Sequence, residues 1–309
     1  MSVSSGKVIK VSNLLKSYGS IKAVDQISFE VAQGEVFGML GPNGAGKTTT
    51  VEIVEGLRTA DSGSATVLGI DVAKDTRAVK ERIGIQPQSP ALFPSLTVRE
   101  TVRFFRSLYR KSLPTSRIVE LASLEASRDV LFKNLSGGQQ QRLSVALAFV
   151  NDPEIIFLDE PTTGLDPQAR RAMWDVIETF RRAGKTVVLT THYMEEAQRL
   201  CDRIAIMDYG KIIALDSPQR LIEFNIKESA IQFKMKDYPG DQVLAGLPDV
   251  SKVVREEDDI IVYTNNIPSA ISGLLGMASQ RSTDLSELSV RQATLEDVFL
   301  KLTGKRIRD

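Results

Sequence analysis

The feature that most constrains the fold is a glycine-rich segment, Gly41–Thr48, which follows the apolar run Val36–Leu40 and opens a helical pattern. Its sequence, GPNGAGKT, fits the pattern G-x-x-x-x-G-K-[ST]. Glycines let successive backbone N–H groups turn toward one polyanion, and the N-terminus of the following helix favours negative charge. Lys47 adds a positive charge for terminal phosphates, and the Thr48 hydroxyl can ligate Mg²⁺. The segment therefore predicts a nucleotide-phosphate site between a buried strand and a helix.

Apolar runs and helical patterns alternate through the first two thirds of the chain, after two short β-rich runs at 8–11 and 27–31. Continuous apolar runs are typical of parallel strands covered on both faces. We expect strands at 155–158, 187–190 and 204–207, helices at 46–57, 139–151, 168–183 and 194–200, and a further helical region at about 97–132. This alternation predicts an α/β domain with a mostly parallel sheet.

The character of the sequence changes near residues 216–218, and 309 residues suggest two domains at roughly 150 residues each. Residues 230–309 have the pattern strand, helix, strand, strand, helix, strand, helix. The order β-α-β-β-α-β is typical of a ferredoxin-like α+β unit. We therefore expect a first domain over 1–224 and a small C-terminal accessory domain over 225–309.

Two carboxylates, Asp159 and Glu160, end the apolar run 155–158. Open α/β sheets bind ligands at the carboxyl ends of their strands. Asp159 is placed there to bind Mg²⁺, and Glu160 to orient or deprotonate a water molecule. A solvated pair at a strand end is the alternative, which the phosphate loop on the same chain disfavours.

Composition excludes several kinds of function. Lys+Arg and Asp+Glu both total 39, whereas a general nucleic-acid binder shows a basic excess, so we expect no nucleic-acid partner. The single cysteine, Cys201, excludes an internal disulfide and a four-cysteine zinc site. Any catalytic histidine must be His192, the only one. No run reaches 18 apolar residues and none resembles a signal peptide, so we expect a cytoplasmic chain that needs another chain for any membrane process.

A second glycine-rich segment, Leu135–Gln139 (LSGGQ), is followed by Gln140, Gln141 and Arg142 and precedes the LDEPT segment at 158–162. It resembles the signature of ATP-binding cassette (ABC) proteins. Ser136 and two glycines at a helix start form a second anion site, which one nucleotide on the same subunit would not need. The resemblance implies a head-to-tail dimer, in which each ATP lies between one subunit's phosphate loop and the other's signature. Both half-sites are complete in this chain, so a homodimer is expected.

Further segments resemble the remaining motifs of this family. Tyr18 resembles the aromatic residue that stacks on adenine. Gln88 resembles the glutamine that links Mg²⁺ to the helical subdomain, and Gln86 is the alternative for this role. Gly164-Leu165-Asp166 resembles the loop through which the subunits communicate, and His192 the histidine that contacts the γ-phosphate. The resemblance implies catalysis by Glu160 and His192, Mg²⁺ ligation by Thr48, Gln88 and Asp159, and ATP binding by Tyr18, Gly41, Pro42, Asn43, Gly44, Ala45, Gly46, Lys47, Thr48, Thr49, Gln88, Ser136, Gly137, Gly138, Gln139 and Asp166.

The resemblance covers about 220 residues and implies a P-loop NTPase fold of the ABC type. This fold has a mostly parallel core, an antiparallel β part and a helical subdomain at about 89–150. It also implies an ATPase subunit, peripheral on the inner face of the cell membrane, that serves a separate permease. Segments 54–57, 191–197 and 295–304 resemble antibiotic- and multidrug-export subunits of the daunorubicin-resistance type. An importer subunit, a soluble cassette protein and a ligand-sensing tail remain alternatives, and the sequence does not identify the cargo.

Three other patterns have simpler interpretations. Four arginines (99, 103, 106 and 110) recur at helical spacing, which indicates a solvated basic face or a permease-docking surface. The acidic run Glu256–Asp259 indicates a solvated hairpin turn. Leu295, Val298, Phe299 and Leu302 fall on one helix face and indicate core of the small domain.

Overall fold

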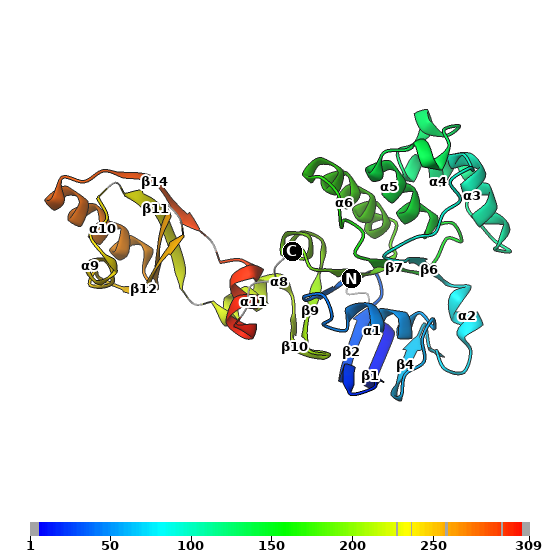
Figure 1. The fold of residues 1–309 in the computed structure, drawn as a ribbon. Helices are drawn as coiled ribbons and strands as arrows, with labels where there is room; N and C mark the ends of the chain where they lie inside the picture. Colours follow the sequence, from blue (N-terminus) through cyan, green and yellow to red (C-terminus); the bar gives the residue numbers. More distant parts are fainter. Residues whose placement is uncertain (1–5, 227, 236, 257–258, 292, 305–309) are drawn as a thin grey trace. The chain divides into compact units, whose positions relative to one another are not determined.

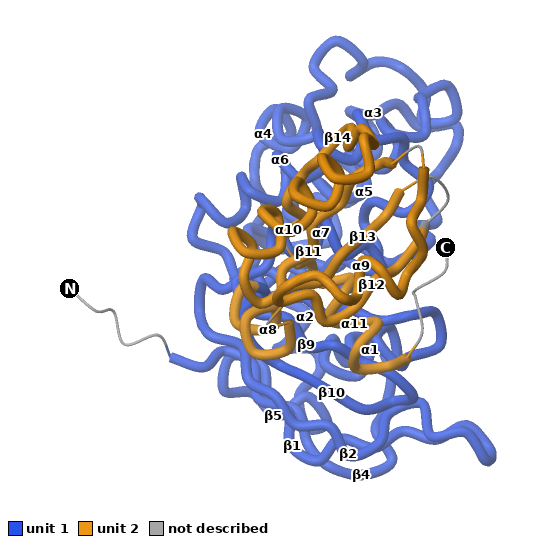
Figure 2. The backbone as a smooth tube through the Cα atoms, turned by 90° about the vertical axis from the view of Figure 1, so that its left-hand side faces the viewer, with its two compact units in different colours: residues 1–218, 307–309 blue, residues 219–306 orange. Residues whose placement is uncertain are grey.

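The structure is a computed structural model that describes residues 6–226, 228–235, 237–256, 259–291 and 293–304. The chain forms two compact units, which divide after Pro218 (Figures 1 and 2). The sequence places this division after residue 224, so helix α8 (Pro218–Asn225) lies almost entirely in the second unit rather than in the first. Among the described residues, no helix has the length and apolar character needed to cross a membrane.

The first unit contains a six-stranded sheet in the order β10-β9-β3-β8-β7-β6, in which all but β10 run parallel. Its strands are β3 (Val36–Leu40), β6 (Ile83–Gln86), β7 (Ile155–Asp159), β8 (Thr186–Thr191), β9 (Arg203–Asp208) and β10 (Lys211–Asp216). Every residue of β3, β7 and β8 is buried, which explains their continuous apolar sequences. The predicted α/β class with a mostly parallel sheet is confirmed.

Helices cover both faces of this sheet. Helix α1 (Lys47–Val54) lies on one side, while α5 (Gly137–Leu147) and α6 (Pro167–Arg182) lie on the other (Figure 1). Helix α7 (Met194–Leu200) follows β8, and the short α2 (Thr76–Lys80) precedes β6. The helices predicted in this part are therefore present, with ends that differ by a few residues.

A second, antiparallel sheet has the order β2-β1-β4-β5. Its strands are β1 (Lys7–Tyr18), β2 (Ile21–Ala32), β4 (Ser62–Val67) and β5 (Ile70–Asp71). β1 and β2 are much longer than the runs expected at 8–11 and 27–31. The sequence predicts only these short runs because the pairing of the two strands is irregular, which breaks the alternation of apolar and polar residues. Phe29 of this sheet stacks on Phe37 of β3, with ring centroids 5.3 Å apart. One apolar core therefore joins the two sheets and α1.

The helical region expected at 97–132 is divided. It contains α3 (Val98–Ser107), α4 (Thr115–Leu121) and two single-turn 3₁₀ helices (Glu125–Ser127 and Phe132–Asn134). Pro114 directly precedes α4 and cannot lie inside a helix without removing a backbone hydrogen bond. Ser123, with φ of 52°, follows its end.

The four arginines consequently do not form one helical face, because Arg110 lies beyond the end of α3. Arg99 pairs with Asp129 at 2.7 Å. Arg106 is half-buried and donates to the hydroxyl of Thr115 at 2.9 Å. Arg103 remains exposed on α3.

The second unit contains a sheet in the order β12-β13-β11-β14 with every neighbouring pair antiparallel. Its elements are β11 (Ser229–Met235), α9 (Asp241–Ala245), β12 (Val250–Glu256), β13 (Asp259–Thr264), α10 (Ile267–Arg281) and β14 (Leu285–Arg291). If the four strands are numbered 1 to 4 along the chain, their order across the sheet is 2-3-1-4. This is the ferredoxin-like arrangement predicted from the β-α-β-β-α-β pattern. The core of the sheet is formed by Ile231, Phe233, Leu244, Ile260, Val262, Ala270, Leu274 and Met277.

Helix α11 (Leu295–Thr303) ends the described chain. Leu295, Val298 and Phe299 are buried as predicted, although they are not part of the apolar cluster of the sheet. Leu302 is 37% exposed, so the fourth position of the expected stripe does not lie in a core. The turn predicted within Glu256–Asp259 falls on residues 257 and 258, which lie outside the described residues.

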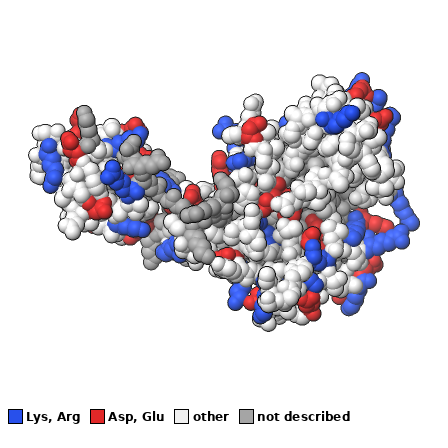
Figure 3. Space-filling model, in the orientation of Figure 1, with Lys and Arg blue, Asp and Glu red and all other residues white. Residues whose placement is uncertain are grey.

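On the face drawn in Figure 3, acidic and basic side chains are interspersed over each unit. This distribution agrees with the balanced composition of the chain. The charges that matter for the candidate site are those few that the fold buries.

Candidate active site

The glycine-rich loop connects β3 to α1 at the carboxyl end of the sheet. Gly46 precedes α1 with φ of 97°, a conformation that L side chains rarely adopt. A Cβ atom at Gly46 would lie 2.1 Å from the carbonyl oxygen of Ala23, and one at Gly41 would lie 2.3 Å from that of Met207. Close backbone approach therefore requires glycine at both positions and fixes the path of the loop.

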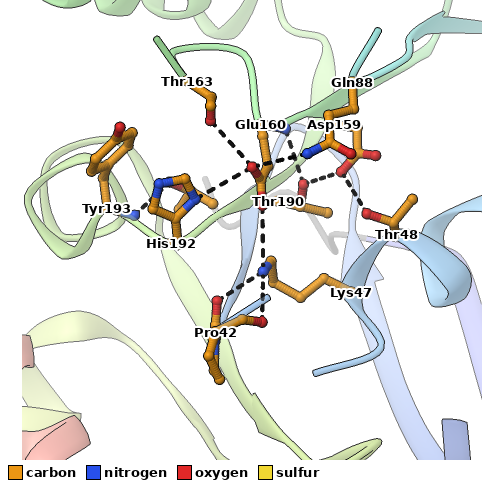
Figure 4. Close-up of polar contacts among 12 residues, drawn as sticks. Pro42, Lys47, Thr48, Gln88, Asp159, Glu160, Thr163, Thr190, His192 and Tyr193 are labelled. Carbon is orange, nitrogen blue, oxygen red and sulfur yellow. Dashed lines mark hydrogen bonds and ion pairs between the residues drawn. The ribbon is translucent and has the colours of Figure 1, made fainter. Parts of the chain in front are cut away.

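Lys47 is held at the centre of this loop. Its ammonium group donates to the carbonyl oxygens of Gly41 (2.8 Å) and Pro42 (3.1 Å) and lies 3.5 Å from the Oε1 atom of Glu160 (Figure 4). Burial lowers the pKa of Lys47, and the nearby carboxylate of Glu160 opposes that shift. The sequence thus places a cation where it can bind an anion.

Asp159 ends β7 beside the first turn of α1. The Thr48 hydroxyl donates to its carboxylate at 3.2 Å, and the Thr190 hydroxyl donates to the same oxygen. Burial raises the pKa of Asp159, whereas these two hydrogen bonds favour the charged form. Thr48 and Asp159 were both predicted as metal ligands, and the fold brings them together.

Glu160 has a backbone φ of 49°, which is uncommon for a residue other than glycine and places its side chain in the centre of the site. Its N–H donates to the Thr190 hydroxyl at 3.0 Å. Its Oε2 atom accepts hydrogen bonds from Thr163 (3.2 Å) and Gln88 (3.3 Å) and lies 3.3 Å from Nδ1 of His192 (Figure 4).

The pKa of Glu160 reflects these neighbours. Burial alone would raise it, but the charge of Lys47, followed by His192, outweighs burial and holds the pKa below its usual value. Glu160 is therefore a charged, oriented acceptor whose side chain is only 4% exposed. A carboxylate in this state can accept a hydrogen bond from water and orient it.

A cavity of about 370 Å³ opens in front of these groups. It is lined by ten of the predicted positions, with Ala23 in addition: Tyr18, Asn43, Gly44, Ala45, Gly46, Lys47, Thr48, Thr49, Gln88 and Glu160. Gly41 and Pro42 do not line it, but their carbonyl oxygens hold Lys47. The loop, the aromatic side chain and the carboxylate therefore surround one cavity that is suited to a nucleotide.

The geometry also separates the two candidate glutamines. Gln88 lines the cavity and contacts Glu160, as described above. Gln86 is 1% exposed at the end of β6, and its side chain donates to the backbone oxygen of Pro87. Gln88 is thus the glutamine that reaches the cavity.

The second glycine-rich segment does not line this cavity. Ser136 caps α5 by accepting the N–H of Gln139 (3.3 Å), whose side chain in turn accepts the N–H of Ser136 (2.9 Å). Asp166 caps α6 in the same way, by accepting the N–H of Ala169 at 2.8 Å. Ser136, Gly137 and Asp166 are exposed, and Gly138 and Gln139 are half-buried. One chain therefore contains both predicted half-sites but does not bring them together.

Sequence reasoning missed two residues of the site, Thr163 and Thr190. Both contact the carboxylates directly, and Thr190 links Asp159 to the backbone of Glu160. Thr190 lies in a run that reads as an ordinary strand, in which threonine is common. Its place at the carboxyl end of the strand, two residues before His192, was the available signal.

The donor groups fit a magnesium ion. Within the described residues, no cluster of three or more His, Cys, Asp or Glu side chains could hold a metal by itself. Mg²⁺ does not require such a cluster, since it usually binds one or two carboxylates together with water and substrate phosphates. Thr48, Asp159 and Gln88 offer a hydroxyl, a carboxylate and an amide oxygen next to the phosphate loop.

The parallel sheet, the phosphate loop after β3 and the acidic end of β7 define the class of this protein as a P-loop ATPase. The family profile described as "ABC transporter" matches residues 24–163. A Nod factor export ATP-binding protein I from Ralstonia nicotianae is 36% identical over 99% of this chain and 97% of its own length. The protein of the same name from Burkholderia pseudomallei is 40% identical over 95% and 96%. The chain belongs to the ABC transporter family, as an ATP-hydrolysing, ATP-binding subunit.

Solved structures agree with this assignment. An ATP-binding cassette solved as a dimer in a post-hydrolysis state with ADP and Pi matches with a TM-score of 0.62 and 28% identity, over 68% of this chain and 98% of that one. The subunit cbiO1 from Clostridium perfringens, part of the ABC transporter complex cbiONQ, matches with a TM-score of 0.64 and 27% identity, over 70% and 91%. The predicted family, fold class and ATPase activity are confirmed.

Proposed function

We propose that this chain powers export of a substrate through a separate membrane permease. The observation that carries the direction is the similarity to Nod factor export subunits, at 36–40% identity over 95% or more of this chain. The match to these relatives spans 95–99% of this chain, whereas the structural neighbours named above cover 68–70% of it. The subunit would lie against the inner face of the membrane, where its permease holds it.

We propose no particular cargo, because the permease selects the transported substrate. The antibiotic and multidrug subtype expected from segments 54–57, 191–197 and 295–304 has no support, because the relatives reported above are named for Nod factor export. Those segments contribute no side chain to the cavity in front of Glu160. We therefore propose the direction of transport from the similarity to these relatives, but we do not propose a substrate.

The proposed working form is a head-to-tail homodimer. Exposure of Ser136 and Gly137, away from the phosphate loop of their own chain, supports this arrangement. The N-terminus of α5 would complete the site of the partner by presenting backbone N–H groups to its ATP. A similar cassette has been solved as a dimer in a post-hydrolysis state, and this supports a dimer of this chain as well.

At each site we assign Lys47 and the loop amides to the phosphates, Tyr18 to the adenine and Glu160 to the attacking water. Gln88 and Thr163 hold the Glu160 carboxylate in place, and we assign His192, whose Nδ1 atom lies 3.3 Å from that carboxylate, to the terminal phosphate. Bound at Thr48, Asp159 and Gln88, Mg²⁺ would neutralise charge on the phosphates. ATP binding would close the dimer, and hydrolysis would reopen it.

The proposed permease contact lies on α3 and the segment before it. Phe93 is 50% exposed and Phe104 is 39% exposed, and their rings meet edge to face with centroids 5.2 Å apart. Arg103 lies exposed beside Phe104. Aromatic and arginine side chains are enriched at protein interfaces. This surface follows Gln88 in sequence, so a conformational change at the nucleotide site can be transmitted through it to the permease.

The test is Glu160→Gln, which keeps the shape of the side chain and removes its charge. We expect ATP hydrolysis to fall at least ~100-fold while ATP binding is retained, since a general base contributes about 10²–10⁴-fold. ATP with Mg²⁺ should then convert the variant into a stable dimer in size-exclusion chromatography. Normal turnover by Glu160→Gln would reject the proposed site. The proposed direction of transport predicts that the permease that co-purifies with this chain moves its substrate out of cells.

A further inference from the structure

The imidazole of His192 is not oriented by a hydrogen bond at its Nδ1 atom. This atom lies 3.3 Å from the Oε2 atom of Glu160. The contact lacks hydrogen-bond geometry, and within the described part of the chain the buried Nδ1 atom has no hydrogen-bond partner. The torsion that rotates an imidazole ring has a broad energy well, and a hydrogen bond at one nitrogen usually fixes it. The orientation of this ring therefore depends on what packs against it.

The aromatic ring of Tyr193 packs against this imidazole. The two ring centroids are 4.1 Å apart, and the ring planes are inclined at 44°. The backbone N–H of Tyr193 donates to the hydroxyl of Thr191 at 2.9 Å, which holds the backbone in a turn around His192. In Figure 4 the Tyr193 ring lies on one side of His192 and Glu160 on the other. The imidazole is therefore enclosed between an aromatic ring and the carboxylate of the site.

An arginine from a different helix contacts the ring of Tyr193. The guanidinium carbon of Arg170, on the first turn of α6, lies 4.0 Å from the centre of this ring. Arg170 is half-buried, and its Nε atom is buried without a hydrogen-bond partner among the residues that the structure describes. A cation is attracted to the negative face of an aromatic ring, more strongly where water is partly excluded. The contact with Arg170 therefore restricts the positions that the Tyr193 ring can take.

We propose that Tyr193 is a positioning residue whose ring, held by Arg170, orients the imidazole of His192 toward Glu160 and the terminal phosphate. Neither Tyr193 nor Arg170 lines the cavity in front of Glu160, so both act through the histidine. Without the ring, the imidazole can rotate away from its productive position, which slows the chemical step and leaves ATP affinity largely unchanged. The proposal rests on the role proposed above for His192.

The kinetic test compares Tyr193→Leu, which removes the ring and stays apolar, with Tyr193→Phe, which keeps the ring. Arg170→Met removes the cation and keeps an unbranched side chain. We expect Tyr193→Leu to lower kcat about tenfold and Arg170→Met about threefold to fivefold, each with the KM for ATP within about twofold of wild type. Tyr193→Phe should stay within about twofold of wild type in kcat, because the contact needs only the ring.

Arg199→Met is the matched control for the arginine. The guanidinium carbon of Arg199, on α7, lies 4.9 Å from the centre of the Trp174 ring, so this variant also removes a cation from an aromatic face. Arg199 does not line the cavity. Its variant should keep kcat within about twofold of wild type.

The orientation of the histidine can be observed directly, because His192 is the only histidine of the chain. Untagged protein labelled with ¹³C-histidine gives one set of imidazole signals in NMR spectra. Arg170→Met keeps both rings, so a changed imidazole chemical shift reports that the rings have moved relative to one another. We expect this change in Arg170→Met and none in Arg199→Met. A merely structural role of Arg170 would lower Tm without moving the signal.

A kcat within about twofold of wild type for Tyr193→Leu would overturn the proposal, as would an equal loss in Tyr193→Phe. An imidazole signal that is the same in Arg170→Met and in wild type would overturn it as well. If Tyr193→Leu does not fold, the kcat and the imidazole signal of Arg170→Met still decide. His192→Ala separates the two accounts. Its normal turnover would reject the proposed role of His192, whereas an inactive His192→Ala with a fully active Tyr193→Leu rejects only the positioning by Tyr193.

Discussion

The ammonium group of Lys47 lies 3.5 Å from the carboxylate of Glu160, and both side chains are only 4% exposed. The cation assigned to phosphate and the base assigned to water thus form one buried ion pair. A bound phosphate chain would compete for Lys47 and release Glu160 to a water molecule.

Lys47→Ala removes the cation from this pair. We expect ATP binding to weaken by ~100-fold, since a hydrogen bond to a charged group contributes about 1.5–3 kcal/mol. Isothermal titration with ATP measures the change. Lys185→Ala is the control, because Lys185 pairs with Asp152 at 2.7 Å outside the cavity. Equal affinity of Lys47→Ala and wild type would contradict the assignment of the loop.

Tyr18 is 42% exposed at the edge of the cavity, where its ring is available to an adenine. Tyr18→Ala should weaken ATP binding about tenfold, because stacking of a base on an aromatic ring contributes about 1–3 kcal/mol. Tyr18→Phe should bind like wild type, since the ring and not the hydroxyl is used. If the two variants bind ATP equally well, Tyr18 does not stack on the base.

Glu55 ends α1 at 3% exposure, and burial, with Asp159 and Glu52 adding to it, raises its pKa to about 8. Because the pKa rises from 4.5 on folding, the folded state binds this proton more tightly than the unfolded state does. The resulting stability is complete at acid pH and is lost as pH rises toward about 8. Glu55→Gln should remove this dependence, which is on the order of a few kcal/mol.

Urea unfolding between about pH 5 and about pH 8 measures the effect of Glu55, with wild type losing stability across this range. Glu125→Gln is the control, since Glu125 is exposed. The same slope in wild type and in Glu55→Gln would show that Glu55 is already ionised in the folded protein.

Arg103→Glu tests the proposed permease contact. The charge reversal should weaken co-purification with a co-expressed permease and leave basal ATPase activity unchanged. Arg106 is unsuitable, because its hydrogen bond to Thr115 is part of the fold. Arg182→Glu on α6, an arginine 75% exposed, serves as the control. Undiminished assembly with Arg103→Glu would exclude this part of α3 from the interface.

The sequence predicted those parts of the fold that burial dictates most strictly. Strand β3 matches its predicted range exactly at both ends because every residue in it is buried. The long strands β1 and β2 were predicted as short runs, since irregular pairing hides their alternation. The helical region 97–132 was predicted without its break because the glycine-free segment before Pro114 carries a weak turn signal.

The candidate site was predicted in type and position but not in its contacts. Sequence patterns identify Lys47, Asp159 and Glu160, yet the left-handed backbone at Glu160 depends on tertiary structure. The same is true of Thr190 and Thr163, whose hydroxyls acquire a role only where two strands end side by side. Local sequence does not encode such long-range juxtapositions.

The central claim is that two copies of this chain share each active site, and mixing two inactive variants tests it most directly. Lys47→Ala damages the phosphate loop, and Ser136→Arg damages the segment at the start of α5 that we propose faces the partner. Each homodimer should be inactive, but a mixed dimer has both defects in one site and none in the other. A 1:1 mixture should therefore regain up to about a quarter of wild-type ATPase activity, since about half of the dimers are mixed and each has one intact site. A mixture as inactive as either variant alone would contradict the shared site.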